Sequence, residues 1–338
     1  MKGIPNIGNT CFINSIFQLL NNIDDLRKYI LSNNYNTSLY DYFNKNKTKL
    51  PHNYESYKEL LLNLQKIFIA LNSDDYEVSK FMQLFCNNLK QLAIEGDYIA
   101  NNISDFSIHN DAEEFLSFIL DKIEDYSIDN NFKFIKNTVA NMNLKNTYQN
   151  KNIIINSFKI QQITQYKCMT CNNLTKLNYN NYLNKIQLSI SKSFIDSLDS
   201  ALSYYTSTDE INEYNCERCK KIGVAKTRTL LSVLPKYIII QLLRFKNNGT
   251  KITKSLDIPL LINLDKYSYK NKELNYELQS VSCHLNFSTS LGHYISITKN
   301  NNKWYIQDDE NIKEIEKHKA FEEIKKNGYI FIFKKCNV

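Results

Sequence analysis

The chain has 338 residues, of which 43% are hydrophobic and 23% charged, a balance typical of a folded globular protein with one large domain or two ordinary ones. No apolar run approaches the roughly 20 residues that span a bilayer, which argues against a membrane partner. The N-terminus lacks the apolar core of a signal peptide, so we expect an intracellular protein, in the cytoplasm, the nucleus or both. The formal net charge is +7, but no dense basic block argues for a nucleic-acid partner.

The first third of the sequence predicts helices. Apolar residues recur at helical spacing in four segments, residues 15–20, 57–71, 78–92 and 111–126. Asn110 or Asp111 is suited to cap the last of these helices.

From about residue 150 the pattern changes to short segments that are rich in β-branched and aromatic residues. These predict strands at residues 153–155, 158–164, 237–243, 281–287, 294–298, 304–307 and 329–333. Two polar stretches, residues 33–53 and 141–152, are predicted to be loops. Helices followed by strands indicate an α+β fold.

Eight cysteines in an intracellular protein are expected to be metal ligands, catalytic groups or buried thiols rather than disulfides. Four of them form two matching C-x-x-C pairs, Cys168 with Cys171 and Cys216 with Cys219. Four thiolates can complete a tetrahedral zinc shell, so we predict one structural zinc ion. Such a shell leaves no coordination position open for catalysis. The segment between the pairs, residues 172–215, would have to fold back as a hairpin or small subdomain to bring the second pair to the first. Two matching pairs make four unrelated thiols or a redox pair the weaker alternatives.

Cys11 is a candidate nucleophile at the start of the first helix, with Asn9 or Thr10 as the cap. Two of the chain's 7 glycines lie within its first eight residues, which indicates a sharp bend just before this cysteine. A helix N-terminus lowers the pKa of a thiol, and its backbone N–H groups can receive an oxyanion. Asn6 would bring a side-chain amide donor to the same place. A cysteine near a helix start is, however, more often a small buried hydrophobic residue.

His293 is the candidate partner of this cysteine. It opens a predicted strand that is followed by a turn at residues 300–302 and a returning strand. Such a hairpin would bring Asp308 beside His293, and the carboxylate would orient the imidazole that deprotonates Cys11. Among the other histidines, His284 is the main competing candidate because it also lies on a predicted strand.

Several motifs carry a family resemblance. Residues 3–18 read G-I-P-N-I-G-N-T-C-F-I-N-S-I-F-Q, residues 292–294 read G-H-Y, and residues 304–309 read W-Y-I-Q-D-D. They resemble the cysteine and histidine boxes of the ubiquitin-specific protease family, papain-like enzymes that cut after the C-terminal glycine of ubiquitin. Residues 109–115, H-N-D-A-E-E-F, resemble the family's Q-Q-D-A-x-E-F box except at its first two positions. The cysteine pairs fall where the family keeps a zinc ion, so the resemblance covers essentially the whole chain.

The resemblance implies a papain-like α+β fold with a helical thumb, a β-rich palm and zinc-bearing β fingers. Residues 1–338 would form a single catalytic domain, with the thumb at 1–130, the fingers at 153–230, and the palm at 131–152 and 231–338. The implied function is a monomeric deubiquitinating thiol isopeptidase that acts through an acyl-enzyme on ubiquitin and ubiquitinated proteins. The alternatives are a catalytically silent ubiquitin-binding scaffold and a protease for another ubiquitin-like modifier.

The resemblance also implies catalytic roles at matching positions. Cys11 would be the nucleophile, and His293 the general base and then the general acid. Asp308 would orient His293. Asn6 would supply an oxyanion donor, and Asp309 would assist at the same site.

The implied substrate contacts fall on four further residues. Asp111 and Glu114 match acidic positions that meet the basic tail of ubiquitin in the family, although charge complementarity at a helix N-terminus explains acids there equally well. Gly292 and Tyr294 would line the narrow channel that accepts two glycines. Asn286 stands where the family's H-x-G motif has glycine, so we expect an altered loop beside this channel.

Overall fold

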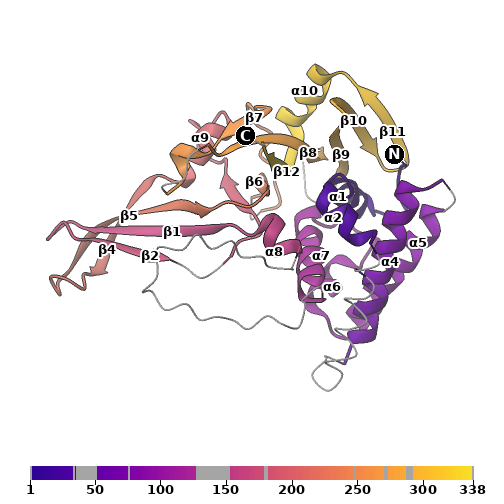
Figure 1. The fold of residues 1–338 in the computed structure, drawn as a ribbon, viewed down its shortest axis with the longest axis horizontal. Helices are drawn as coiled ribbons and strands as arrows, with labels where there is room; N and C mark the ends of the chain where they lie inside the picture. The colour runs from indigo at the N-terminus through magenta and orange to yellow at the C-terminus, as the bar shows by residue number, and fades with distance from the viewer. Residues whose placement is uncertain are drawn as a thin grey trace.

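The computed structural model describes residues 2–32, 35, 52–74, 77–126, 153–178, 182–246, 248–269, 273–286 and 292–336. A bundle of helices, a central sheet and a long projecting sheet follow one another across the molecule (Figure 1). The predicted loops at 33–53 and 141–152, and with them the palm segment 131–152, lie almost entirely outside the described residues.

The N-terminal bundle confirms the predicted helices. Its members are α1 (Cys11–Asn21), α2 (Asp24–Ile30), α4 (Tyr54–Asn72), α5 (Val78–Ile94), α6 (Tyr98–Ile103) and α7 (Ala112–Tyr126). Phe17 of α1 lies edge-to-face against Phe85 of α5 at 5.1 Å and against Phe115 of α7 at 5.4 Å, so α1 is the central helix of this core. Among the described residues, no helix is both long and apolar enough to cross a membrane.

The strand predicted at residues 153–155 is wrong, because these residues begin helix α8 (Ile153–Phe158). Three consecutive isoleucines favour a strand locally. In the fold, however, Ile154 and Phe158 stand four residues apart and are both buried, which is the spacing of a helix face that packs into the bundle. The strand predicted at 158–164 accordingly begins only at Gln161.

The central sheet has strand order β11-β10-β9-β8-β12-β6-β3, and β7 also pairs with β8. Its strands are β3 (Ile186–Ser189), β6 (Tyr237–Leu243), β7 (Leu261–Asn263), β8 (Asn275–Leu285), β9 (His293–Asn300), β10 (Lys303–Asp308), β11 (Asn311–Ile315) and β12 (Gly328–Lys335). The helical bundle covers one face, and α9 (Leu198–Tyr205) and α10 (Lys317–Asn327) cover the other. Both faces are therefore buried, which explains the long apolar runs of β6, interrupted by Gln241, and of β12.

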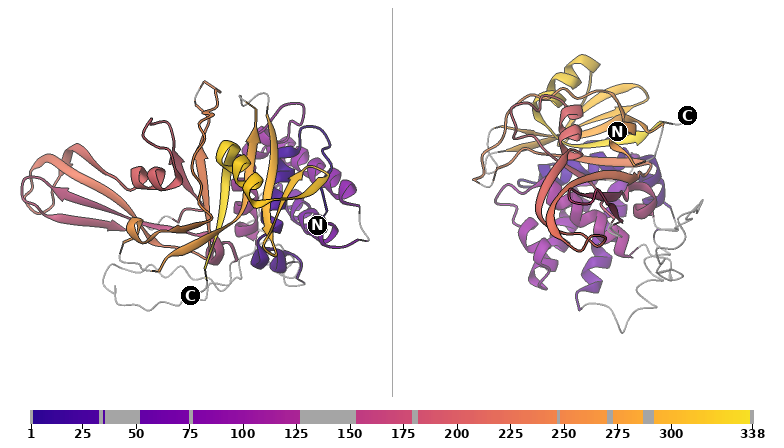
Figure 2. Two further views of the ribbon diagram at one scale, coloured as in Figure 1. Left: turned by 90° about the horizontal axis from the view of Figure 1, so that it is seen from above. Right: turned by 90° about the vertical axis from the view of Figure 1, so that its left-hand side faces the viewer.

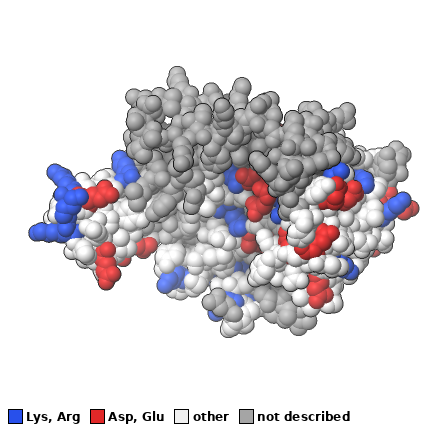
Figure 3. All heavy atoms as spheres, turned by 90° about the horizontal axis from the view of Figure 1, so that it is seen from below, with Lys and Arg blue, Asp and Glu red and all other residues white. Residues whose placement is uncertain are grey.

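The second sheet projects away from the rest of the molecule (Figure 2). It has the order β2-β1-β5-β4, with β1 (Gln161–Cys168), β2 (Leu174–Asn178), β4 (Thr208–Asn215) and β5 (Ile222–Val233). Its far end carries the two cysteine pairs at the turns β1–β2 and β4–β5. On the face drawn in Figure 3, several basic side chains gather at this tip with acidic ones beside them, and side chains of both charges are scattered over the rest of the described surface.

The hairpin β9–β10 confirms the predicted strand–turn–strand. Asn301 and Asn302 have positive φ values of 47° and 63°, the geometry of a two-residue turn that suits the twist of the flanking strands and that asparagine tolerates. Asn300 pairs with Lys303, and Ser296 pairs with Gln307. This register brings the end of β10 next to the start of β9.

Arg244, just after β6, should be a major source of stability. It is 0% exposed, and its guanidinium donates to the carbonyl oxygens of Gly328 at 2.7 Å and of Ile252 and Lys254 at 3.0 Å. Burial lowers its pKa to about 10, so it stays charged at neutral pH. Arg244→Met leaves these carbonyls unpaired and should lower the free energy of unfolding by about 3 kcal/mol, measured in urea at pH 7.

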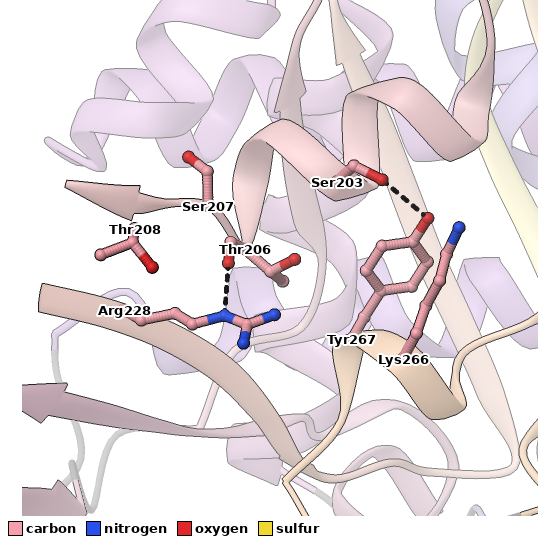
Figure 4. A pocket seen from close by; sticks show the side chains of 7 residues that line it. All are labelled: Ser203, Thr206, Ser207, Thr208, Arg228, Lys266 and Tyr267. Atoms are coloured by element: carbon pink, nitrogen blue, oxygen red, sulfur yellow. Dashed lines mark hydrogen bonds between the residues drawn. The ribbon is translucent and has the colours of Figure 1, made fainter.

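Arg228→Met is the matched control. Arg228 is exposed at a pocket lined by hydroxyl groups, where its Nε donates to the Thr206 carbonyl oxygen at 2.8 Å (Figure 4). Its loss should change the free energy of unfolding by no more than about 0.5 kcal/mol. Equal effects of the two variants would contradict the structural role of Arg244.

Candidate active site

Cys11 is the first residue of α1 and is 2% exposed. The chain turns sharply into the helix, as expected, because Gly8 and Asn9 have positive φ values of 102° and 45°. Thr10 is the N-cap residue, and its hydroxyl is turned back to accept a hydrogen bond from the Ile7 N–H at 3.1 Å. The sulfur thus lies at the end of α1 that carries the positive end of the helix dipole.

His293 lies between Cys11 and Asp308. Its Nε2 is 2.6 Å from Asp308 Oδ1, as the predicted hairpin requires. A hydrogen bond with the Cys11 thiol, reinforced by Asp308 and opposed by burial, raises the pKa of His293 to about 9. The structure therefore brings together three candidate catalytic groups from opposite ends of the chain.

Asp309 fastens the N-terminal segment to the β10–β11 turn. Its carbonyl oxygen accepts from the Ile4 N–H at 2.9 Å. Its carboxylate accepts from Asn6 Nδ2 at 2.9 Å and from Asn14 Nδ2 at 2.8 Å. At Gly3 a Cβ would overlap the backbone of Glu310, so the segment can lie this close only with glycine there.

The Asn6 side chain is held in one orientation. Its amide oxygen accepts from the Thr10 N–H at 3.0 Å, while its amide nitrogen donates to Asp309. A carboxamide nitrogen carries two N–H groups, so one remains for a further acceptor beside Cys11.

Asp111 and Glu114, the two acidic candidates of the Q-Q-D-A-x-E-F box, have different hydrogen-bond partners. Asp111 caps α7 by accepting from the Glu113 N–H at 2.7 Å, and it also accepts from the Tyr329 hydroxyl at 2.9 Å. Burial raises the pKa of Asp111 to about 6 against these hydrogen bonds. Glu114 accepts from Asn102 Nδ2 at 3.2 Å. Asp111 is the cap that the sequence predicted, and contact of either acid with ubiquitin stays a prediction.

Gly292 and Tyr294 both pack on His284. A Cβ at Gly292 would overlap the His284 ring, and the Tyr294 ring centroid lies 4.7 Å from that ring. His284 is 1% exposed, and burial lowers its pKa to about 3, so it is a neutral residue of the interior. Glycine is therefore required at position 292 by the interior of the fold, and the channel formed by Gly292 and Tyr294 stays a prediction.

Asn286, where the family motif has glycine, adopts a backbone conformation that glycine also reaches easily. Its φ is 70°, in the left-handed region that asparagine tolerates better than most residues. Its carbonyl oxygen accepts from the buried Lys251 ammonium at 3.1 Å. The altered loop beside the channel stays a prediction, because residues 287–291 lie outside the described residues.

The four cysteines at the tip of the projecting sheet form one cluster. One sulfur from each lies within 4.8 Å of the others, and single pairs are 3.9 Å and 3.6 Å apart, in a group made of Cys168, Cys171, Cys216 and Cys219. A tetrahedral zinc ion with Zn–S bonds of about 2.3 Å needs sulfurs about 3.8 Å apart. The cluster therefore has the donors and the spacing to hold a zinc ion.

The two cysteine turns have the same backbone. The residue after each pair, Asn172 or Lys220, has a positive φ of 55° or 58°. Its N–H donates to the carbonyl oxygen of the first cysteine, at 2.9 Å for Cys168 and 2.8 Å for Cys216. Two matching turns that face each other indicate a metal site rather than four unrelated thiols.

Asn14 and Gln18 also belong to the site; both fall within the motif of residues 3–18, but the motif by itself assigned neither of them a role. Both are buried in α1. They stand three and seven residues after Cys11, on the helix side that carries the thiol. Buried carboxamides in an apolar helix are a usable sequence signal, but their partners come from the other end of the chain.

A family model described as ubiquitin carboxyl-terminal hydrolase matches residues 2–333. The chain belongs to the ubiquitin carboxyl-terminal hydrolase family. This membership confirms the resemblance to ubiquitin-specific proteases and the enzyme class, a cysteine-type deubiquitinase.

Relatives of known name agree with this assignment. Ubiquitin carboxyl-terminal hydrolase 4 of Arabidopsis thaliana is 24% identical over 93% of this chain and 85% of its own length. Ubiquitin carboxyl-terminal hydrolase 12 of Salmo salar is 26% identical over 98% and 88%. Ubiquitin carboxyl-terminal hydrolase 36 of Drosophila melanogaster is 25% identical over 98% of this chain, which spans only 29% of that protein.

Solved structures confirm the α+β fold of the family's catalytic domain. A chain of the SAGA Ubp8/Sgf11/Sus1/Sgf73 DUB module bound to ubiquitin aldehyde is similar with a TM-score of 0.74 and 20% identity, over all of this chain and 70% of that one. The Ubp8-Sgf11-Sgf73-Sus1 SAGA DUB module gives 0.73 and 18%, over 100% and 68%.

The raised pKa of Asp111 predicts a pH-dependent cost of folding. The folded state holds this proton up to about pH 6 but the unfolded state only up to a pKa of 3.8, so the contribution to stability is fully present below pH 3.8 and is lost once the pH has risen through 6. Asp111→Asn does not titrate. Its free energy of unfolding relative to wild type should therefore rise by up to about 3 kcal/mol between pH 4 and pH 7, measured in urea. A difference that is independent of pH would contradict this prediction.

Proposed function

We propose that this protein is a thiol isopeptidase that hydrolyses the bond after the C-terminal glycine of ubiquitin. The proposal rests on the position of the His293 imidazole between the Cys11 thiol and the Asp308 carboxylate. Membership of the hydrolase family and the fold shared with a ubiquitin-aldehyde complex support it. Ubiquitin and ubiquitinated proteins are the proposed partners, and the proposed form is an intracellular monomer.

In the first step His293 takes the proton of Cys11, and the thiolate attacks the carbonyl carbon of the ubiquitin glycine. Asp308 holds the imidazole in the orientation that the transfer needs and stabilises its charged form. His293 then gives this proton to the leaving lysine amine. The C–N bond breaks, and a thioester to Cys11 remains.

In the second step a water molecule attacks the thioester, and His293 now acts on the water as the general base. The C–S bond breaks, the thiol is restored and ubiquitin leaves with a free C-terminal carboxylate. Both tetrahedral intermediates carry an oxyanion. The free amide N–H of Asn6 and the N–H groups at the start of α1 are the proposed donors to that oxygen, with Asp309 holding the Asn6 amide in place.

The substrate contacts are proposed to follow the family pattern. Asp111 and Glu114 contribute negative charge beside the path of the basic ubiquitin tail, and Gly292 and Tyr294 border the channel for its two glycines. Asp111 already accepts hydrogen bonds from Tyr329 and Glu113, so its orientation is set before any ligand arrives.

The cysteine cluster is proposed to hold one structural zinc ion. Four thiolates close the coordination shell, so the ion would join the two turns at the tip of the projecting sheet and would take no part in the reaction at Cys11.

Cys11→Ala tests the catalytic proposal. The variant should lose at least about 1,000-fold in the rate of cleaving a fluorogenic ubiquitin C-terminal amide, because the nucleophile is gone. Ubiquitin binding, measured by calorimetry, should persist. Undiminished turnover by the variant would refute the assignment of Cys11.

Electrophilic probes separate the two alternative functions. Ubiquitin carrying a C-terminal vinyl group should label wild-type Cys11 and leave Cys11→Ala unlabelled, whereas a silent scaffold would leave both unlabelled. Probes built on other ubiquitin-like modifiers, used at equal concentration, should label the wild type more slowly. Faster labelling by one of them would reassign the substrate.

Zinc content provides an independent test of the cluster. The wild type should carry about one zinc ion per chain by elemental analysis, and Cys216→Ser should carry none and melt at a lower temperature. Cys336→Ser removes a partly buried cysteine outside the cluster and should keep the ion. A metal-free wild type that is folded and active would contradict the site.

A further inference from the structure

The interface between α1 and strands β8, β9 and β10 is polar although it is buried. None of its polar side chains is more than 4% exposed, and the set comprises Asn14, Ser15, Gln18, Ser280, Ser282, Ser296, Thr298 and Gln307. Apolar side chains would be the cheaper filling for such an interface, because a buried polar group destabilises the fold unless it is hydrogen-bonded. The polar residues therefore need a reason specific to this interface.

The central feature of the interface is a relay of side-chain hydrogen bonds. Ser296 Oγ of β9 donates to Gln307 Oε1 of β10 at 2.8 Å. Gln307 Nε2 donates to Gln18 Oε1 of α1 at 3.1 Å. Gln18 Nε2 in turn donates to the Lys2 carbonyl oxygen at 2.9 Å. Both ends of each carboxamide are thus engaged, and the helix is joined to two strands and to the N-terminal segment.

The relay lies close to the reacting groups. Gln307 immediately precedes Asp308, and its strand partner Ser296 lies three residues after His293. Gln18 stands seven residues after Cys11, which is two helical turns along the same side of α1. A shift of α1 against the hairpin would therefore move the sulfur relative to the imidazole.

Hydrogen bonds resist such a shift in a way that apolar contacts do not. Donor–acceptor distance and angle are both restricted, whereas the hydrophobic effect is non-directional and rewards burial in more than one register. Further polar contacts act at either end of α1. Asn14 donates to Asp309 at 2.8 Å, and Asn22 donates to the Gln279 carbonyl oxygen at 3.2 Å.

We propose that Gln18 and Gln307 are positioning residues that set the register between the helix of the nucleophile and the hairpin of the general base. This inference concerns the same site and rests on the proposed thiol chemistry of Cys11. Its function is distinct from holding the fold together, because it predicts a change in Cys11 reactivity that a mere loss of stability would not produce.

Alkylation of Cys11 by iodoacetamide tests the proposal without ubiquitin. The 338-residue chain, purified without chelators, is labelled between pH 6 and 9, and the Cys11 peptide is quantified by mass spectrometry. A thiol without an imidazole partner has a pKa of about 8.5 and is only about 1% ionised at pH 6.5. Gln18→Met and Gln307→Met should therefore lower the rate at pH 6.5 by about tenfold to 100-fold and leave it nearly unchanged at pH 9.

The double variant Gln18→Met/Gln307→Met separates positioning from stability. Each single variant breaks the Gln18–Gln307 hydrogen bond on one side only and should melt at a lower temperature. The double variant removes that mismatch, but Ser296 still loses its acceptor and the Lys2 carbonyl oxygen its donor, so only part of the loss should be regained. The low rate at pH 6.5 should persist in the double variant, because the directional link is absent. Recovery of the wild-type pH profile by the double variant would overturn the proposal.

Gln65→Met is the matched control. Gln65 is a buried carboxamide of α4 that donates to the Ile30 carbonyl oxygen at 2.7 Å, in the bundle and away from the hairpin. This variant should melt at a lower temperature and keep the wild-type alkylation profile. A profile altered as strongly as that of Gln18→Met would overturn the proposal.

Two outcomes distinguish this inference from the proposed function. A wild type that alkylates readily at pH 6.5, loses that reactivity in Gln18→Met, and cleaves no ubiquitin substrate would refute the isopeptidase and support the positioning role. A wild type that cleaves ubiquitin while Gln18→Met alkylates normally would support the isopeptidase and overturn the positioning role.

Discussion

The packing of α1 against the β9–β10 hairpin is the constraint on which the candidate site depends. A sulfur from the start of the chain meets an imidazole and a carboxylate from near its end only because this helix lies on this hairpin. The contact between the Ile4 N–H and the Asp309 carbonyl oxygen closes the same junction from the other side. Loss of register here would separate the reacting groups even if every element kept its secondary structure.

The central sheet can hold both sides of the molecule because both of its faces are buried. Ile239 and Ile332 point into the helical bundle, while their neighbours Ile238 and Phe333 point toward α9 and α10. The polar interface between α1 and strands β8, β9 and β10 is the exception to this apolar packing on the bundle side. It occurs where an exact position matters more than the largest gain from apolar burial, since hydrogen bonds are directional and apolar contacts are not.

Much of the fold could be predicted because the patterns that encode it are local. Apolar spacing predicted the helices from 57–71 and 78–92, and asparagines at a turn predicted the hairpin. The failure at residues 153–155 has the same origin, because three isoleucines favour a strand until the position of Phe158 in the bundle is known. The match of the cysteine turns was likewise visible as two C-x-x-C pairs before their sulfurs were seen to meet.

The sequence by itself determined which chemistry is present: a cysteine at a helix start, a histidine on a hairpin with an acid at its end, and two cysteine pairs. Only the tertiary structure decided how these groups are held. In the folded protein the Asp111 carboxylate accepts a hydrogen bond from Tyr329. The Asp309 carboxylate accepts hydrogen bonds from Asn6 and Asn14, and Gln307 donates one to Gln18. The physical reason is that periodicity and turn propensity depend on neighbours along the chain, whereas these hydrogen bonds join residues that become neighbours only when the chain has folded.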